Sequence, residues 1–170
     1  MSNILNNIQS KIRSKIIIDY DMKRSTWFRT GGNAKGYTII NDIPDLKKII
    51  SFANQIKYYV VGVGSNLMVR DQGFDGLVIK LGRNFNNIKI KNNTLSVGAG
   101  VLDINLSKFA LKNSIKGFEF FSGIPGTIGG AVKMNAGCFG SQTADNLKRI
   151  LVINKFGKIQ YLNKKELKMN

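Results

Sequence analysis

The sequence predicts a folded protein that contains both α-helices and β-strands, and three observations favour this interpretation. Helical periodicity and short β-branched runs alternate along the 170 residues. Two pairs of predicted strands meet at short turn sequences, Asn92-Asn93 and Phe156-Gly157, which is typical of antiparallel hairpins. A hydrophobic content of 43% is enough to build a buried core. The length allows one domain of ordinary size or two small ones.

The first forty residues predict a helix, a strand and a second strand. Isoleucine recurs at every fourth position within residues 3–13, which predicts a short amphipathic helix. The β-branched run at 16–18 predicts a strand. An ordered loop over 25–36 and a strand over 37–40 are expected to follow.

A β-α-β unit is completed by the next helix and strand. Pro44 lies near the predicted helix start, and apolar residues continue at helical spacing to Ala53. Residues 58–61 are apolar throughout, so we expect a strand that is buried on both faces. This strand leads directly into a segment that contains two glycines, 62–67.

The second half begins with strands and one clear helix. Residues 77–81 predict a strand, and 87–91 and 94–97 predict the two arms of a hairpin. Apolar spacing over 102–113 predicts a helix that begins near Asp103, a residue type favoured at helix starts.

The last twenty residues predict a hairpin and the beginning of a helix. Strands over 150–153 and 158–162 flank the second turn sequence. Asn163 and Glu166 have the spacing of a capping box, which announces a helix near the end of the chain. A frayed terminal turn that packs on the sheet is the alternative, but we expect a chain that stops before its fold is complete.

Composition excludes several kinds of chemistry. The chain has no histidine, which removes a Ser-His-Asp triad and a Cys-His pair, and its single cysteine, Cys138, allows no internal disulfide and no zinc cluster. The formal charge is +16, mostly from scattered lysines. Three interpretations stay open: a solvated lysine surface, a surface for anionic ligands, and dedicated nucleic-acid binding. No apolar run has the length of a membrane span or a signal peptide, so we expect a soluble cytoplasmic protein.

The segment 62–67 (Gly-Val-Gly-Ser-Asn-Leu) is a candidate anion site. Its glycines let backbone amides turn toward an anion, and Ser65 and Asn66 add side-chain donors. The spacing matches neither the Rossmann fingerprint nor the Walker A loop. A pyrophosphate cradle and an ordinary tight turn are both compatible with these residues.

The segment 122–131 (Ser-Gly-Ile-Pro-Gly-Thr-Ile-Gly-Gly-Ala) is a stronger signal, with four glycines and a proline in ten residues. Its apolar side chains require burial, so its backbone is pressed against a flat ligand or against another part of the chain. A tightly packed turn between core elements is the alternative. Residues 134–137 (Met-Asn-Ala-Gly) form a second segment rich in small residues, which also permits the close approach of a ligand or of another part of the chain. Its asparagine adds an amide side chain.

These segments together resemble the UDP-N-acetylenolpyruvoylglucosamine reductases. The resemblance rests on 62–67, on Glu-Phe-Phe at 119–121 followed by the glycine segment to 131, and on 134–137. Residues 26–32 (Thr-Trp-Phe-Arg-Thr-Gly-Gly) resemble the N-terminal motif of that family. The match runs in order from about residue 23 to the end of the chain.

The resemblance implies a flavoenzyme of bacterial cell-wall synthesis with the FAD-binding fold of the vanillyl-alcohol-oxidase/PCMH type. Two α+β subdomains, 1–80 and 81–170, would bind FAD non-covalently between them. In this family NADPH reduces the FAD, and the reduced flavin converts UDP-N-acetylenolpyruvoylglucosamine to UDP-N-acetylmuramate. The segment 62–67 would hold the pyrophosphate, and 123–137 would line the flavin and ribityl chain.

The implied cofactor-binding residues follow from these two segments, and Arg29 is an additional candidate. They are Gly62, Val63, Gly64, Ser65, Asn66, Leu67, Gly123, Ile124, Pro125, Gly126, Thr127, Gly129, Gly130, Asn135, Ala136 and Gly137.

No catalytic residue and no metal ligand is assigned. The arginine, serine and glutamate that act in this family have no counterpart in residues 1–170, and neither has its third domain, which binds the UDP-sugar. We expect these residues alone to be inactive and to meet the UDP-sugar only when that domain is supplied. A monomer with no membrane partner and no specific nucleic-acid partner is expected.

A competing interpretation is a basic RNA-binding module. Residues 116–121 (Lys-Gly-Phe-Glu-Phe-Phe) partly match the aromatic strand motif of RNA-recognition domains. Glu119 stands where that motif has a small residue, and the glycines that follow have no role in it. This interpretation requires a strand at 116–121.

Overall fold

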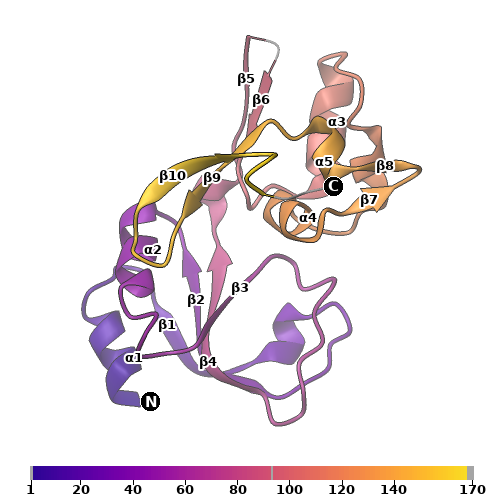
Figure 1. The fold of residues 1–170 in the computed structure, drawn as a ribbon. Helices are drawn as coiled ribbons and strands as arrows, with labels where there is room; N and C mark the ends of the chain where they lie inside the picture. The colour runs from indigo at the N-terminus through magenta and orange to yellow at the C-terminus, as the bar shows by residue number, and fades with distance from the viewer. Residues whose placement is uncertain (1, 93, 168–170) are drawn as a thin grey trace. The chain divides into compact units, whose positions relative to one another are not determined.

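The computed structural model describes residues 2–92 and 94–167, which divide into two units (Figure 1). Unit 1 contains the described residues up to 84 together with 153–158, and unit 2 contains 85–152 and the described residues from 159 onward. The subdomain boundary expected from the sequence lay between residues 80 and 81. The units divide instead between Asn84 and Phe85, and the short segment 153–158 groups with unit 1.

Unit 1 is built on a four-stranded mixed sheet. Its strands lie in the order β1-β2-β4-β3, with β1 antiparallel to β2 and both β2 and β3 parallel to β4. The predicted β-α-β unit is therefore present, and β4 is inserted between its two strands. Figure 1 shows the α-helices α1 and α2 beside the sheet. The elements are α1 (Ser2–Gln9), β1 (Ile16–Asp21), β2 (Asn33–Ile40), α2 (Ile43–Ile50), β3 (Tyr58–Val61) and β4 (Phe74–Leu81).

Both faces of the sheet are buried at β4. Alternate residues of a strand point to opposite faces, and in β4 Leu77 and Ile79 alternate with Val78. Val78 packs in a cluster that includes Tyr37 and Met22, which begins a 3-10 helix (Met22–Ser25) after β1. This helix brings the polypeptide that follows β1 onto the Val78 face of the sheet.

The predicted double burial of strand 58–61 is wrong. Tyr59 and Val60 are 50% and 49% exposed, because β3 is an edge strand of the sheet. The predicted helix over 3–13 is also shorter and ends at Gln9. Farther along, the backbone N–H groups of Arg13 and Ser14 donate to buried Asp45 at 2.9 Å each, which holds this segment in a turn.

The strand predicted over 37–40 begins earlier than its sequence signal. Strand β2 extends back to Asn33 through Gly36, where an added Cβ would lie 3.1 Å from side-chain atoms of Leu5 and Leu77. Pairing with β4 is irregular between Ala34 and Gly36. The glycine therefore allows close packing at a bulge, although glycine is a poor strand signal.

Unit 2 consists of small hairpins and short helices around a compact core. The core cluster joins α3 and α4 to the aromatic pair Phe120 and Phe121. The predicted helix start near Asp103 and the hairpin around Asn92 are confirmed, while Asn93 lies outside the described residues. The elements are β5 (Ile88–Lys91), β6 (Thr94–Val97), α3 (Asp103–Lys112), a 3-10 helix (Glu119–Gly123), α4 (Ile128–Met134), β7 (Gly137–Cys138), β8 (Ser141–Gln142), α5 (Thr143–Asn146), β9 (Arg149–Ile153) and β10 (Ile159–Asn163).

The second predicted hairpin and the capping box are both present. Strands β9 and β10 pair on either side of the turn that contains Gly157. The Asn163 N–H donates to Glu166 Oε2 at 2.8 Å, and the Glu166 N–H donates to Asn163 Oδ1 at 3.1 Å. Residues 164–167 form a turn, and the rest of the predicted helix lies outside the described residues.

The strand that the RNA-binding interpretation requires is absent from 116–121, all of which are described. Residues 119–123 form a 3-10 helix, and Phe120 and Phe121 are buried at 4% and 3% exposure. The aromatic rings therefore belong to the core of unit 2. Among the described residues, no helix has both the length and the apolarity needed to cross a membrane.

Candidate functional site

In unit 1, the segment 62–67 is held against the loop that follows β1. Gly64 has a φ of +73°, and a Cβ at this position would lie 2.1 Å from the backbone oxygen of Ser25. The Trp27 N–H donates to the Gly64 oxygen at 3.0 Å. Only glycine fits both this backbone conformation and this close approach, so the two loops form one wall.

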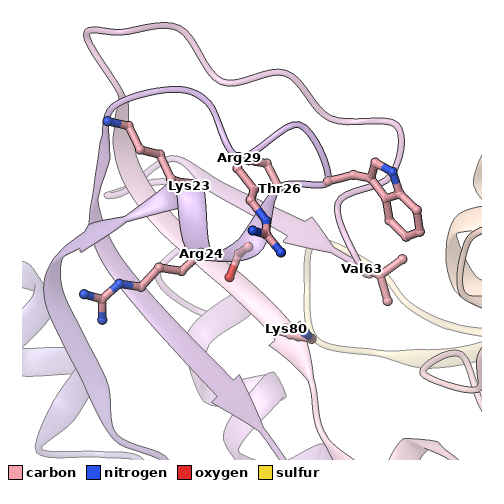
Figure 2. A pocket seen from close by; sticks show the side chains of 8 residues that line it. Lys23, Arg24, Thr26, Arg29, Val63 and Lys80 are labelled. Carbon is pink, nitrogen blue, oxygen red and sulfur yellow. The ribbon is translucent and has the colours of Figure 1, made fainter.

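A pocket of about 750 Å³ opens beside this wall. Lys23, Arg24 and Arg29 come from the segment after β1, whereas Lys80 comes from β4 (Figure 2). Of the predicted cofactor residues, Val63 lines this pocket. The lining residues are Lys23, Arg24, Ser25, Thr26, Trp27, Arg29, Val63 and Lys80.

The lining of this basic pocket carries four positive side chains and no acidic one. Arg24 has a distant counter-ion, because its Nε lies 4.0 Å from Asp21 Oδ2. Arg29 has a φ of +52°, a backbone conformation that is uncommon for a residue with a side chain. Trp27 is 61% exposed and offers an aromatic face for stacking. The pocket therefore suits an anion that is attached to a flat ring.

Sequence reasoning named only part of this pocket. It singled out Val63 and, as an additional candidate, Arg29, but it missed Lys23, Arg24 and Lys80. These residues are ordinary members of a lysine-rich composition, and only the sheet brings β4 beside the loop after β1. One signal was available in the sequence, because two basic residues lie just before the motif at 26–32.

In unit 2, most glycines of the predicted segment face protein atoms. A Cβ would lie 2.5 Å from Cys138 Sγ at Gly123, 2.5 Å from Asp103 Oδ2 at Gly126, and 2.9 Å from the Ala99 oxygen at Gly129. These three glycines permit close packing within the unit.

Gly130 differs from these glycines. It is exposed, and the nearest atom to an added Cβ is Thr127 Oγ1 at an ordinary 3.5 Å. Thr127 caps α4, and its Oγ1 accepts from the Gly130 N–H at 3.4 Å. Packing within the protein therefore does not require a glycine here, although glycine in a helix costs about 0.5–1 kcal/mol relative to alanine. An open surface of this kind fits the approach of a ligand.

The substitution Gly130→Ala separates folding from ligand binding. We expect the free energy of unfolding to rise by up to about 1 kcal/mol, because alanine is the better helix former. We expect FAD binding to weaken, because the methyl group occupies the open surface. Thermal melts and FAD titration measure the two effects, and Ser107→Ala on α3 is the control for helix propensity alone. Unchanged FAD affinity would show that Gly130 does not face the cofactor.

Asn135 acts as a connector within unit 2. It ends α4 in the left-handed conformation, with a φ of +44°. Its Nδ2 donates to Gln142 Oε1 and its Oδ1 accepts from the Ala144 N–H, each at 2.9 Å. Ala136 and Gly137, the other predicted residues of this segment, have backbone partners of their own: the Ala136 oxygen accepts from the Thr143 N–H at 2.9 Å, and Gly137 pairs with Gln142. No group of three His, Cys, Asp or Glu side chains that could hold a metal ion occurs in the described part of the chain.

A family model and curated relatives match most of this chain. Residues 34–163 match the FAD binding domain family, which covers most of the chain. A UDP-N-acetylenolpyruvoylglucosamine reductase of Pelagibacter ubique is 46% identical over 157 residues, which is 91% of this chain and 52% of that protein. A reductase of the same name from Rickettsia typhi is 45% identical over 150 residues, which is 88% of this chain and 51% of that protein.

Solved structures are also similar to this chain. The UDP-N-acetylenolpyruvylglucosamine reductase of Thermus caldophilus superposes with a TM-score of 0.75 at 32% identity, over 91% of this chain and 53% of that protein. The 6-hydroxy-D-nicotine oxidase of Arthrobacter nicotinovorans has a TM-score of 0.65 at 20% identity, over 91% and 37% of the two chains, which shows a shared fold.

The chain belongs to the FAD binding domain family. The predicted α+β fold of the vanillyl-alcohol-oxidase/PCMH type is confirmed, and so is the resemblance to UDP-N-acetylenolpyruvoylglucosamine reductases. The chain spans about half the length of the curated relatives it matches.

Proposed function

We propose that this chain is the FAD-binding part of an NADPH-dependent reductase that acts on UDP-N-acetylenolpyruvoylglucosamine. The observation that carries the proposal is the basic pocket beside the segment 62–67, in a chain of the FAD binding domain family. Four cationic side chains at one pocket suit a diphosphate, because charge-assisted hydrogen bonds to phosphate are the strong ones.

Residues in each unit fit a part of the cofactor. In unit 1, Arg29 and Lys80 would neutralise the diphosphate, and Trp27 would stack on the adenine. In unit 2, the open surface at Gly130 would receive the flavin or its ribityl chain. When bound, FAD supplies hydride-transfer chemistry, and the protein supplies binding and orientation. The proposal of non-covalent binding is supported by the absence of histidine and by the partly buried position of Cys138 against the unit 2 core.

The remaining parts of the proposal rest on the reductases this chain resembles. NADPH is the proposed hydride donor, and the enolpyruvyl group of the UDP-sugar is the proposed acceptor. Hydride addition to that alkene needs a stabilising cation and a proton donor. We assign no residue of this chain to these roles, so residues 1–170 alone are expected to form no UDP-N-acetylmuramate. A cytoplasmic monomer is proposed.

A chimera tests this proposal directly. Residues 1–170 would replace the matching half of the Pelagibacter ubique reductase. We expect the chimera to oxidise NADPH only when FAD and UDP-N-acetylenolpyruvoylglucosamine are both present, and residues 1–170 alone to give no product. A chimera that folds and binds FAD but gives no product would contradict the assignment to this reductase. Product from residues 1–170 alone would show that the catalytic groups have been misplaced.

A further inference from the structure

A buried carboxyl group lies directly beneath the bend of the glycine segment in unit 2. Asp103 is 0% exposed, and neither of its side-chain oxygens has a hydrogen-bond partner among the described residues. An added Cβ at Gly126 would lie 2.5 Å from Asp103 Oδ2. The carboxyl group therefore occupies the space that the missing side chain of Gly126 leaves.

The backbones of these two regions are joined on either side of this contact. The Asp103 N–H donates to the Gly126 oxygen at 3.1 Å, and the Ile128 N–H donates to the Val101 oxygen at 2.9 Å. These bonds form an antiparallel bridge between Leu102 and Thr127. The position of residues 126–128 is consequently tied to the first turn of α3, where Asp103 is the first residue.

The surroundings of Asp103 carry no compensating charge. Residues 99–102 and 124–130, which pack on either side of it, contain no titratable side chain. The nearby charged groups are exposed and lie on other elements or farther along α3: Lys108 and Lys112 on α3, Glu119 on the 3-10 helix that packs against α3, and Lys133 on α4. Glu119 is engaged locally, because its Oε2 accepts from the Gly117 N–H at 2.7 Å.

Burial raises the pKa of Asp103 from 3.8 to about 7. The folded protein therefore binds this proton more tightly than the unfolded chain does, over the range from about pH 4 to pH 7. Stability from this group consequently decreases as the pH rises through that range, and the loss is complete only above the folded-state pKa. Above that pKa an ionised carboxylate sits unpaired against Gly126, which is costly in a buried site.

We propose that Asp103 is a positioning residue of the flavin site: its neutral carboxyl group fills the space beneath Gly126 and is compatible with the packed bend, whereas its ionisation displaces residues 124–130 and weakens cofactor binding. The inference rests on the proposed FAD binding for its functional consequence. Its structural part, the coupling between one carboxyl group and one segment, does not depend on the cofactor. Ionisation of Asp103 would make FAD binding sensitive to pH near neutrality.

The test compares the full chain with Asp103→Asn, which keeps the shape and removes the charge, with Asp103→Ser as a second neutral variant. Asp145→Asn is the matched control, because Asp145 is an exposed acid in the first turn of α5. The dissociation constant of FAD is measured between pH 6 and pH 8. Hydrogen exchange of residues 124–130, corrected for the intrinsic rate, is measured at both ends of that range without FAD.

In the wild-type chain the dissociation constant of FAD is expected to rise about tenfold from pH 6 to pH 8. Only molecules with a neutral Asp103 bind FAD well, and their fraction falls over this range. Exchange protection of 124–130 is expected to fall in parallel. Both neutral variants should lose this pH dependence, and Asp145→Asn should retain it. Equal pH profiles in wild type and Asp103→Asn would overturn the proposal, and so would a protection change with no change in affinity. If no chain binds FAD at any pH, the proposed function fails, while the exchange data still decide whether Asp103 controls the segment.

Discussion

Replacing Arg29 and Lys80 together by glutamine is expected to weaken FAD binding by about 100-fold. Both side chains line the basic pocket beside 62–67 and come from different elements, so they would approach a diphosphate from two directions. A hydrogen bond to a charged group contributes about 1.5–3 kcal/mol, and about 3 kcal/mol in total corresponds to roughly a 100-fold change in affinity.

The charge-matched control is the pair Lys89→Gln and Lys91→Gln, which removes two exposed lysines from β5. Both double variants lower the net charge equally, so only a local effect of the pocket distinguishes them. The FAD affinity of the wild type should also fall more steeply with salt than that of the pocket variant. Equal affinities in the two double variants would contradict the placement of the diphosphate in this pocket.

The substitution Gly126→Val is expected to destabilise unit 2 strongly. A branched side chain at this position would meet the fully buried Asp103, whose Oδ2 lies 2.5 Å from the Cβ site. Overpacking of this kind costs up to about 3 kcal/mol, which lowers the melting temperature by roughly 6–12 °C. FAD binding should fall far more than in Lys89→Gln or Lys91→Gln, because the glycine segment is displaced.

A double-mutant cycle identifies the cause of that loss. Gly126→Ala should be costly in the wild type and much less costly in an Asp103→Ala background, where the opposing oxygen is removed. Equal costs in the two backgrounds would show that Asp103 is not what excludes a side chain at Gly126. An unchanged melting temperature with lost FAD affinity would instead indicate that Gly126 faces the ligand.

Local signals predicted much of the fold. The hairpin around Asn92, the helix start at Asp103 and the reciprocal bonds of Asn163 and Glu166 depend on neighbouring residues, and all three are present. Helix α4 has only a weak local signal, because Thr127 is a favourable N-cap but Gly129 and Gly130 are poor helix formers. The exposure of β3 followed from the strand order, which no local pattern contains.

The candidate site was also predictable from the sequence only in part. The glycine segments are continuous in sequence, so composition and resemblance were enough to single them out. The basic pocket draws Lys80 from β4 to the loop after β1, and this juxtaposition exists only in the folded sheet. The roles of the individual glycines also required tertiary information. Gly64 and Gly126 permit contacts within the protein, whereas Gly130 faces open space.

Non-covalent binding of FAD by these residues is tested most directly by the flavin content of the purified chain, released by denaturation and quantified by its spectrum. The melting temperature before and after FAD is added completes the measurement. We expect denaturation to release FAD from the folded chain, and added FAD to raise the melting temperature of the flavin-free chain. A folded chain that releases no FAD, and whose melting temperature does not change when FAD is added, would contradict the account.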